Sequence, residues 1–507
     1  MRFLLAFLLL FLLRGDLPLP KLLGDGWTIL RGTLPAPDFN LLDGHGLNTC
    51  PEPQAPLSRL LYQRTQGQGA SLSCGNRVLG LIHFPNPDPS YSSQPASNLG
   101  GFAPLIGQIL SAKREVLIAN MLWDSGAQSP GAAIAAALAQ MRLDLQAHPE
   151  RYPDGLKVKI MLGHSIRLGN LTDPAANAYT AAAQLLAAGI PLGDDPVQGW
   201  HLELADYGYA MPHQHIKLIV VDRQDVSAGG YNVSWYHLPT TVRSPDALQG
   251  GGQGLNDLAL RVQGPVARHA VAAFRDGWLL SHTLTCAALP TPNTVRQVCG
   301  FTAKPTFALE YAAPAPAAGN AHVYGLYRRS GYTEADDAIT ALFGAAQQSI
   351  EVMQAQVSGT LRCSLTLVSG ECRFPNDHLS VWVAALHAVR ERHVRLRLLL
   401  DYDPLLRWEG LALLASFRAA LRPDGLQDLV EARWYKEPAG THAKAALVDG
   451  QLLTVGSQNL HFSSFGPQGL AEYTLATDDA ATIQEFQNQF AFEWARASAV
   501  KLPWWVR

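Results

Sequence analysis

The sequence predicts an α/β protein made of two similar α/β/α halves, a pseudo-twofold duplication in which each half is a mixed central sheet flanked by helices. Two observations support this prediction. Apolar segments of strand length alternate with helical segments along the chain, which is typical of sheets covered by helices. The same order of elements then occurs twice, with the same polar motif at the same place, and such repetition indicates a duplicated unit.

The predicted elements of the two halves correspond one to one. The first half has a helical stretch at 102–112 and strands at 115–121, 158–162, 201–205 and 215–221. The second half has a helical stretch at 335–346 and strands at 349–356, 394–400, 430–435 and 442–448. Each half finishes with a helix that contains tryptophan, around 274–278 and 492–494. Two unrelated α/β domains are the alternative, which the repeated order disfavours.

The repeat also predicts the domain boundaries. We expect an N-terminal half at 40–300 and a C-terminal half at 320–507, with one active site shared between them. The join is predicted at 312–319, a stretch rich in alanine and proline, because such clusters mark loops.

The composition narrows the class of protein. Of the 507 residues, 48% are hydrophobic and 16% are charged, which gives enough apolar material for a large core and too little charge for disorder. The formal net charge is -3, so no overall positive field attracts nucleic acid, although a local basic groove is compatible with that total. We therefore do not expect a nucleic-acid partner.

The N-terminus indicates export. Arg2 precedes an unbroken apolar run at 3–13, and Arg14 follows it. A membrane span needs about 20 apolar residues, so this run is too short, whereas a positive start and a short apolar core are typical of a secretory signal. We expect residues 1–25 to be a signal peptide-like segment, with its cleavage site left open. A buried N-terminal helix is the alternative.

The six cysteines agree with export. Six cysteines allow 15 pairings, but their clustering along the chain favours three local ones, and an oxidising compartment would allow them to form. The alternative is six free thiols in a reducing compartment. The expected pairs are Cys50–Cys74, Cys286–Cys299 and Cys363–Cys372. No group of cysteine and histidine has the spacing of a zinc site, so no metal is expected.

Two polar motifs with identical spacing are the most specific feature of the sequence. The first has His215, Lys217 and Asp222, then six residues, then Gly229-Gly230-Tyr231-Asn232. The second has His442, Lys444 and Asp449, then six residues, then Gly456-Ser457-Gln458-Asn459. Either motif alone could be a core strand with a polar end. The pair, at fixed offsets, makes chance occurrence negligible.

Strand geometry gives the motif a chemical sense. Residues two apart on a strand point to the same face, so the histidine and lysine of each motif project toward one site. We expect Asp222 and Asp449 to be structural, holding the turns or the two halves together. Glycine lets the backbone pass close to a ligand, which gives Gly230, and Ser457 at the matching position, a structural place in the motif. Amide side chains at the last position can donate hydrogen bonds to a phosphate oxygen.

These motifs resemble the signature of the phospholipase D superfamily. The first copy has Gly-Gly where the family more often has Gly-Ser, and this departure resembles the secreted bacterial phospholipases D. Weaker similarities are Tyr62-Gln63-Arg64-Thr65, Asn256-Asp257-Leu258-Ala259-Leu260, and Trp278 followed by Cys286. The resemblance covers residues 45–500, but only the two motifs are strongly specific. It implies a secreted or cell-envelope bacterial protein.

The resemblance implies a two-step displacement at phosphorus through a phosphohistidine. One histidine attacks, and the other protonates the leaving alcohol and then deprotonates water or an acceptor alcohol. By similarity to the secreted enzymes, His215 is the expected nucleophile and His442 the expected acid/base. The remaining expected site residues have two roles. The phosphoryl oxygens would be stabilised by Lys217, Lys444, Asn232 and Asn459. The histidines would be oriented by Asp257 and Glu472. For these two carboxylates a solvated loop charge is the alternative.

The expected reaction is cleavage of the headgroup-side phosphodiester of glycerophospholipids, at a membrane or micelle surface, with water or an alcohol as acceptor. We expect no cofactor, and we expect the protein to be a monomer. Alternatives within the same chemistry are a cardiolipin-synthase-like phosphatidyltransferase, which usually has N-terminal membrane spans, and a secreted nuclease. A non-catalytic binding protein is disfavoured because binding alone does not need two histidines.

Two weaker hypotheses concern neighbours of the first motif. His213 and His215 could form part of a metal site, although no third ligand is evident. Tyr207, Tyr209 and Trp235 lie close to the motif in sequence and could line a headgroup pocket.

Overall fold

The computed structural model describes residues 36–37, 39, 49–164, 173–192, 195–209, 212–243, 251–307, 315–361, 363, 372–403, 407–435 and 439–502. The predicted signal segment at 1–25 lies outside the described residues, as does the first part of the predicted join at 312–319. Among the described residues, none of the helices has the length and hydropathy needed to cross a bilayer.

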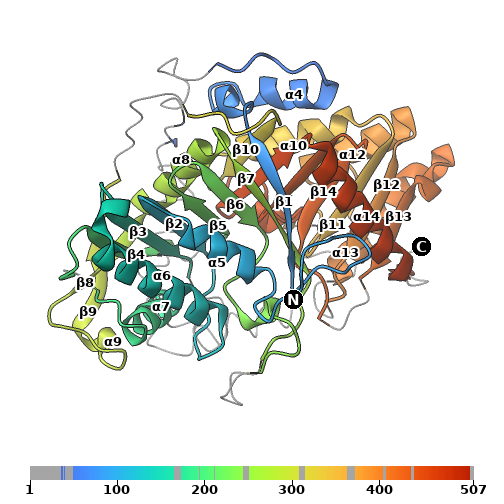
Figure 1. Cartoon of the computed structure of the whole chain (residues 1–507). Coiled ribbons are helices and arrows are strands. Elements are labelled where there is room, and N and C mark those ends of the chain that lie inside the picture. Colours follow the sequence, from blue (N-terminus) through green and yellow to red (C-terminus); the bar gives the residue numbers. More distant parts are fainter. Residues whose placement is uncertain are drawn as a thin grey trace.

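The first half is built on a nine-stranded mixed sheet (Figure 1). β2, β3 and β4 are parallel to one another at its centre, and the remaining neighbours are antiparallel. In spatial order the strands are β1 (Arg77–Phe84), β7 (Asp257–Gln263), β6 (Asp225–Gly229), β5 (Leu218–Val221), β2 (Glu115–Asn120), β3 (Leu156–Leu162), β4 (Trp200–Tyr207), β8 (Ser281–Cys286) and β9 (Cys299–Ala303).

The second half has an eight-stranded sheet with the same strand order, and among its described residues no strand corresponds to β9. Its parallel centre is β11, β12 and β13. In spatial order the strands are β10 (Val323–Arg328), β16 (Glu472–Thr477), β15 (Leu452–Gly456), β14 (Lys444–Val448), β11 (Ser349–Gln354), β12 (Arg395–Leu400), β13 (Val430–Trp434) and β17 (Ser498–Ala499). The duplicated α/β fold predicted from the sequence is therefore confirmed.

Helices cover both sheets, and the sheets separate three hydrophobic clusters. One cluster lies between the first sheet and its outer helices α5 (Phe102–Leu110), α6 (Pro130–Ala147) and α7 (Ala176–Ala187). A second lies between the second sheet and α10 (Glu334–Ala345), α12 (Ser380–Arg392) and α13 (Arg407–Leu421). The third contains residues of both sheets, of α8 (Val266–Leu279) and of α14 (Ala480–Arg496). The short helix α9 (Val295–Val298) precedes β9.

Local sequence explains where the longest helices begin. The hydroxyl of Ser129 accepts a hydrogen bond from the Ala132 amide, and Pro130 occupies the first turn of α6. In α14, the Asp479 carboxylate accepts from the Thr482 amide at 2.9 Å. Both residues satisfy amides that a helix cannot bond internally at its start, so the helix boundaries are encoded in the chain.

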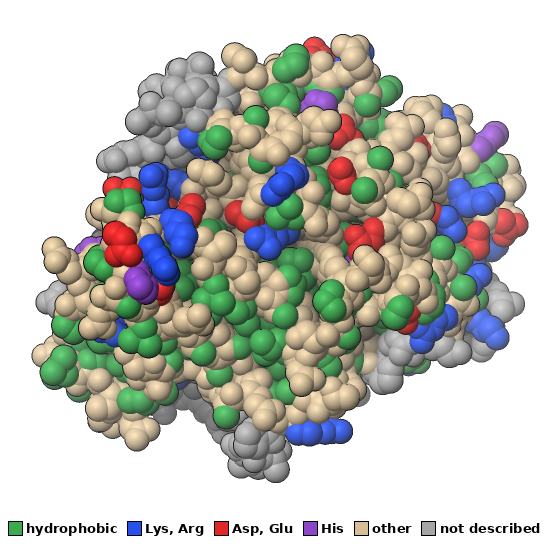
Figure 2. Space-filling model, in the orientation of Figure 1, with side chains coloured by type: hydrophobic (Ala, Val, Ile, Leu, Met, Phe, Trp, Pro, Cys, Tyr) green, Lys and Arg blue, Asp and Glu red, His purple; other side chains and the backbone are tan. Residues whose placement is uncertain are grey.

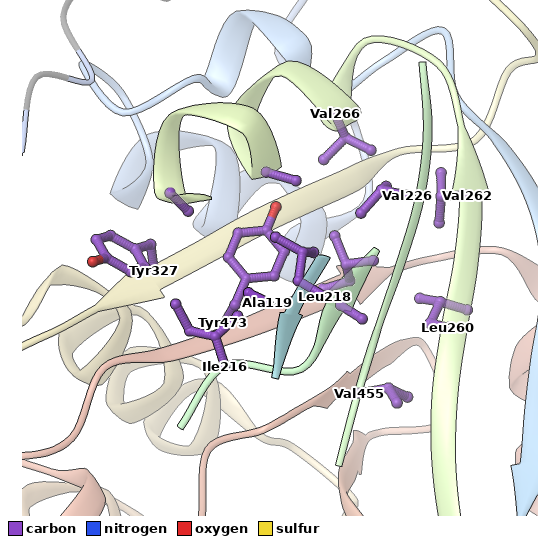
Figure 3. Packing of buried hydrophobic residues seen from close by; sticks show 14 of the residues in the cluster. Ala119, Ile216, Leu218, Val226, Leu260, Val262, Val266, Tyr327, Val455 and Tyr473 are labelled. Carbon is purple, nitrogen blue, oxygen red and sulfur yellow. The ribbon is translucent and has the colours of Figure 1, made fainter. Parts of the chain in front are cut away.

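The third cluster joins the two halves (Figure 3). Leu218 and Leu260 of the first sheet pack in it together with Val455 and Tyr473 of the second sheet. Two polar contacts repeat the pseudo-symmetry at its margins: His83 of β1 lies 2.9 Å from Glu485 of α14, and Arg329, which follows β10, pairs with Asp276 of α8. The halves thus share one apolar core.

Helix α4 (Pro56–Arg64) packs against the second half, although it precedes the first sheet in the chain. Leu57 and Leu61 belong to the hydrophobic cluster of the second half. The Ser58 hydroxyl donates to Asp478 at 2.7 Å, and the Tyr324 hydroxyl donates to the Ser58 carbonyl at 2.8 Å. Periodicity alone could not reveal which half the helix joins.

The cysteines pair locally as the sequence predicts. The disulfides are Cys50–Cys74, Cys286–Cys299 and Cys363–Cys372. Each closes a loop within 24 residues or fewer, which restricts the unfolded chain and stabilises the folded one.

Candidate active site

The two motifs lie at the carboxyl ends of the parallel strands. β5 starts beside the end of β2, where Leu218 pairs with Ala119, and β14 starts beside the end of β11, where Lys444 pairs with Gln354. The sequence predicted strands from His215 and His442, but the regular strands begin at Leu218 and Lys444. The motif strands were therefore predicted too long at their start, because the histidine segments pair with the other half instead.

A short parallel bridge connects each histidine segment to the opposite half. Gln214 bridges Ala471, and the His215 amide donates to the Ala471 carbonyl at 2.9 Å. By the same arrangement Thr441 bridges Asn256, and the His442 amide donates to the Asn256 carbonyl at 2.7 Å. In each case the bridged residue immediately precedes an acidic residue, so the backbone itself brings that carboxylate to the histidine.

Each histidine is hydrogen-bonded to a carboxylate from the other half. His215 Nδ1 lies 2.9 Å from Glu472 Oε2, and His442 Nδ1 lies 2.8 Å from Asp257 Oδ2. Both carboxylates are fully buried, so they are not solvated loop charges. A carboxylate on Nδ1 fixes the tautomer of the ring and leaves Nε2 for chemistry. The structure thus brings together four of the residues singled out from the sequence.

Glu472 is held by two hydroxyl groups. The Ser457 hydroxyl donates to Oε2 at 2.6 Å, and the Ser464 hydroxyl donates to Oε1 at 2.7 Å. These bonds give the motif residue Ser457 a direct structural role that the sequence left unspecified. Ser464 was missed by the sequence analysis, and only its place seven residues after Ser457 could have drawn attention to it.

Asp257 is held differently. Its Oδ1 accepts from the Leu258 amide at 2.8 Å, and Gly230 occupies the position that corresponds to Ser457. A Cβ at Gly230 would lie 2.3 Å from Asp257 Oδ1, so any side chain there would displace the carboxylate. The second glycine of the first motif, Gly230, is therefore a packing requirement of the carboxylate.

The two lysines are buried beside the histidines. Lys217 Nζ donates to the carbonyl of His215 at 2.8 Å, and Lys444 Nζ donates to the carbonyl of His442 at 2.5 Å. Burial lowers the pKa of Lys444 to about 8, and it also lowers the pKa of Lys217, while Glu472 and Asp257 act in the opposite direction. Two ammonium groups in a buried site are suited to bind an anionic group such as a phosphodiester.

Burial sets the charge state of the histidines. Desolvation, followed by the charge of Lys217, lowers the pKa of His215 well below its ordinary value, and desolvation with Lys444 does the same for His442. Desolvation raises the pKa of Glu472 to about 7 and that of Asp257 to about 6. Neutral imidazole is the form that acts as a nucleophile or base, so burial of the two rings favours that form.

Asn232 and Asn459 occupy equivalent, buried positions after the glycine pairs. In both, the side-chain oxygen has no hydrogen-bond partner in the described structure. Asn120 holds the backbone on both sides of Asn232, because its Oδ1 accepts from the Val233 amide and its Nδ2 donates to the Tyr231 carbonyl. Carboxamides with a free oxygen are available to a polar ligand.

Asp222 and Asp449 organise turns within each half, not contacts between the halves. Asp222 accepts hydrogen bonds from three successive amides at the start of β2, those of Lys113, Arg114 and Glu115, at 2.8–2.9 Å. Asp449 accepts from the amides of Gln347, Gln348 and Ser349 at 2.7–2.9 Å. Both aspartates have positive φ, 51° and 53°, a conformation that aspartate tolerates better than most residues.

Two charged residues near the site were not found from the sequence. Arg328 is fully buried and donates to the carbonyl of Leu470, two residues before Glu472, at 2.7 Å. It also lies 3.0 Å from Asp336. Asp401 accepts from the Thr441 amide at 2.9 Å and raises the pKa of Lys444. No motif marks either residue.

The weaker hypotheses fare differently. Tyr207 and Trp235 are buried within hydrophobic clusters, so they are core residues and do not line a headgroup pocket. Two groups of potential metal ligands occur among the described residues. Cys363, Cys372 and His378 form one, but its cysteines are joined in a disulfide; His237, Asp257 and His442 form the other, with ligand atoms within 4.8 Å of one another. The first group therefore has no free thiolate.

The fold and the site define a class of protein: a duplicated α/β enzyme fold with two crossed histidine–carboxylate pairs and two buried lysines. Residues 341–494 match the family described as "Cardiolipin synthase, PLD-like domain". Residues 341–494, in the second half of the chain, therefore form a domain like those of the phospholipase D superfamily. No curated protein sequence matches it significantly.

One of two similar solved structures shows the same fold at low sequence identity. Phosphatidylserine synthase from Haemophilus influenzae Rd KW20 matches with a TM-score of 0.50 and 13% identity, over 87% of this chain and 92% of that chain. Nuc, a phospholipase D family member from Salmonella typhimurium, matches with a TM-score of 0.28 and 14% identity, over 36% of this chain and 99% of that chain. The first likeness shows the fold shared across both halves.

Proposed function

We propose that this protein cleaves the headgroup-side phosphodiester of glycerophospholipids and passes the phosphatidyl group to water or to an alcohol. The observation that carries the proposal is the pair of crossed dyads, His215–Glu472 and His442–Asp257, at 2.9 and 2.8 Å. Two oriented imidazoles supply both functions that a double displacement needs, a nucleophile and an acid/base.

The first step joins the phosphatidyl group to the enzyme. Nε2 of neutral His215 attacks phosphorus, and a nitrogen–phosphorus bond forms as the bond to the headgroup oxygen breaks. His442, protonated when the phosphodiester is bound, gives its Nε2 proton to that oxygen, so the headgroup leaves as a neutral hydroxyl. The ammonium groups of Lys217 and Lys444 stabilise the charge on the phosphoryl oxygens.

The second step reverses these roles. His442, now neutral, removes a proton from water or an alcohol, and the oxygen attacks phosphorus. The nitrogen–phosphorus bond breaks, His215 becomes free, and phosphatidate or a new phosphodiester is released. Hydrolysis and transfer differ only in the acceptor. The carboxyls of Glu472 and Asp257 hold the rings throughout by their bonds to Nδ1.

A phosphatidyltransferase is the second candidate. The matched family is described by the name cardiolipin synthase, and one similar structure is titled phosphatidylserine synthase, both names of transferases. The likeness to the solved structure shows the fold alone, so we place transfer to a lipid or amino-alcohol acceptor beside hydrolysis. Lipid is favoured over nucleic acid by charge: the face in Figure 2 has basic side chains interspersed with acidic ones, and the formal net charge of the chain is -3.

We further propose that the protein works outside the cytoplasm as a monomer. The three disulfides support export, since such bonds persist in oxidising compartments. Secretion of the intact chain from a bacterial host, followed by light scattering of the purified protein, tests both points.

The decisive experiment mixes purified protein with vesicles that contain several phospholipid headgroups, with ethanol and EDTA present. Mass spectrometry then measures free headgroups, phosphatidate and phosphatidylethanol. We expect phosphatidylethanol from the wild type, no product from His215→Ala, and normal product from His201→Ala, an exposed histidine on β4. Adding serine, glycerol or phosphatidylglycerol as acceptors separates a transferase from a hydrolase. If the protein releases no product from any lipid but nicks a plasmid, the proposed substrate class is wrong and the substrate is nucleic acid.

A further inference from the structure

The two dyads differ in how their carboxylates are held. The second motif supplies hydroxyls at two positions, Ser457 and Ser464, and both donate to Glu472. With the offset of 227 residues between the motifs, the corresponding residues of the first half are Gly230 and His237. Where one carboxylate has two serine donors, the other has no side chain at the first position and an imidazole at the second.

His237 is placed beside both members of its dyad. It is fully buried, and its Nδ1 lies 3.8 Å from Asp257 Oδ2, the oxygen that His442 also contacts. The rings of His237 and His442 have centroids 5.5 Å apart. Among the described residues, neither ring nitrogen of His237 has a hydrogen-bond partner of ordinary geometry, and the nearby backbone of Leu255 acts on the ring only by raising its pKa. A buried polar group without a partner is costly and calls for an explanation.

We infer that His237 is a positioning residue, which shares Asp257 with His442 and thereby controls the proton affinity of the acid/base histidine. This inference rests on the proposed function for the role of His442. A movement of less than 1 Å brings Nδ1 of His237 to within hydrogen-bond distance of Asp257. A donor at that oxygen draws off part of the negative charge that would otherwise stabilise a protonated His442.

The result is an asymmetry suited to two different roles. The hydroxyls of Ser457 and Ser464 donate hydrogen bonds to Glu472 and draw off part of its negative charge throughout the cycle. Asp257 is flanked by an imidazole that can adjust its contact as His442 gains and loses a proton during the cycle. Burial lowers the pKa of His237 to about 3, so it acts as a neutral donor. The titratable groups that act on Asp257 and His442 from the packed elements are Lys444, Lys217, His215 and His237.

Two variants separate positioning from simple packing. In His237→Asn, the amide Nδ2 takes the place of the ring Nδ1 and retains a donor toward Asp257. In His237→Leu, a side chain of similar volume has no donor. The matched control is Ser464→Ala, which removes a donor from the opposite carboxylate and leaves Asp257 untouched.

The test is a pH titration of the His442 ring nitrogens by NMR, with nitrogen-15 histidine in the intact protein and no lipid. In His237→Leu we expect the pKa of His442 to rise by about one unit, a tenfold change in proton affinity. His237→Asn and Ser464→Ala should titrate at His442 like the wild type. The inference is overturned if Leu and Asn variants titrate alike, whether both match the wild type or both depart from it.

Headgroup release by the same proteins is measured separately. We expect about a tenfold loss of kcat in His237→Leu, with KM unchanged, and recovery in His237→Asn. If the wild type cleaves no lipid but the titration shows the expected shift, the proposed substrate is wrong and the role of His237 stands. If lipid is cleaved and the titration shows no shift, the function stands and the role of His237 is rejected.

Discussion

His215 and Glu472 are hydrogen-bonded at 2.9 Å although 257 residues separate them in the chain. His442 and Asp257 form the matching contact across 185 residues. Each half therefore supplies the base of one pair and the carboxylate of the other, and neither half contains a complete dyad. The shared core, in which Tyr473 packs with Leu218, is consequently part of what builds the candidate site, because it fixes how closely the two pairs meet.

The crossed pairing predicts which step each carboxylate serves. With a p-nitrophenyl phosphodiester, whose leaving group needs little protonation, Glu472→Gln should slow the first burst of p-nitrophenol because it disturbs His215. Asp257→Asn should leave the burst and slow the later turnover, which depends on His442. We expect losses of about 10²- to 10⁴-fold in the affected step, the range for general acid–base groups. Stopped-flow absorbance measures both phases.

The same substrate tests the two histidines directly. His442→Ala should release at most one equivalent of p-nitrophenol and retain a phosphorylated protein, since the base for the second step is missing. His215→Ala should release none. Intact-mass spectrometry after acid-free quenching detects the adduct, and peptide mapping locates it. An adduct on His442 in a His215→Ala protein would make His442 the nucleophile and His215 the acid/base.

The lysines predict a pH dependence of anion binding. Burial lowers the pKa of Lys444 to about 8, so its positive charge is present below that pH and is lost as the pH rises through it. We expect the affinity for inorganic phosphate to fall about tenfold between pH 7.5 and pH 9.5, since each pKa unit corresponds to a tenfold change. Calorimetry at the two pH values measures it. Lys444→Met should bind weakly at both values, and an unchanged pH response in that variant would assign the effect to Lys217.

The sequence was sufficient for the parts of the fold that depend on local periodicity. Apolar strands and the repeated motif predicted both sheets, and the spacing of the cysteines predicted the disulfides. The crossing of His215 to Glu472 could not be predicted, because it depends on how two separately patterned halves pack. Arg328 was invisible for a related reason: a buried arginine bonded to the Leu470 carbonyl has no sequence pattern. Packing also decided that α4 joins the second half.

Asp222 and Asp449 give the last prediction, which concerns stability alone. Each carboxylate accepts three backbone amide bonds at the start of a central strand, so replacement by alanine leaves those amides without their partner and puts a side chain less tolerant of positive φ at 51° or 53°. We expect Asp222→Ala and Asp449→Ala each to lower the free energy of unfolding by about 1–3 kcal/mol, and Asn to restore part of it because asparagine tolerates this backbone region. Urea unfolding measures the change. Since both aspartates lie at the far ends of β5 and β14 from the histidines, the folded variants should retain the kcat of the wild type; a loss of kcat at full folding would instead give these aspartates a part in the chemistry.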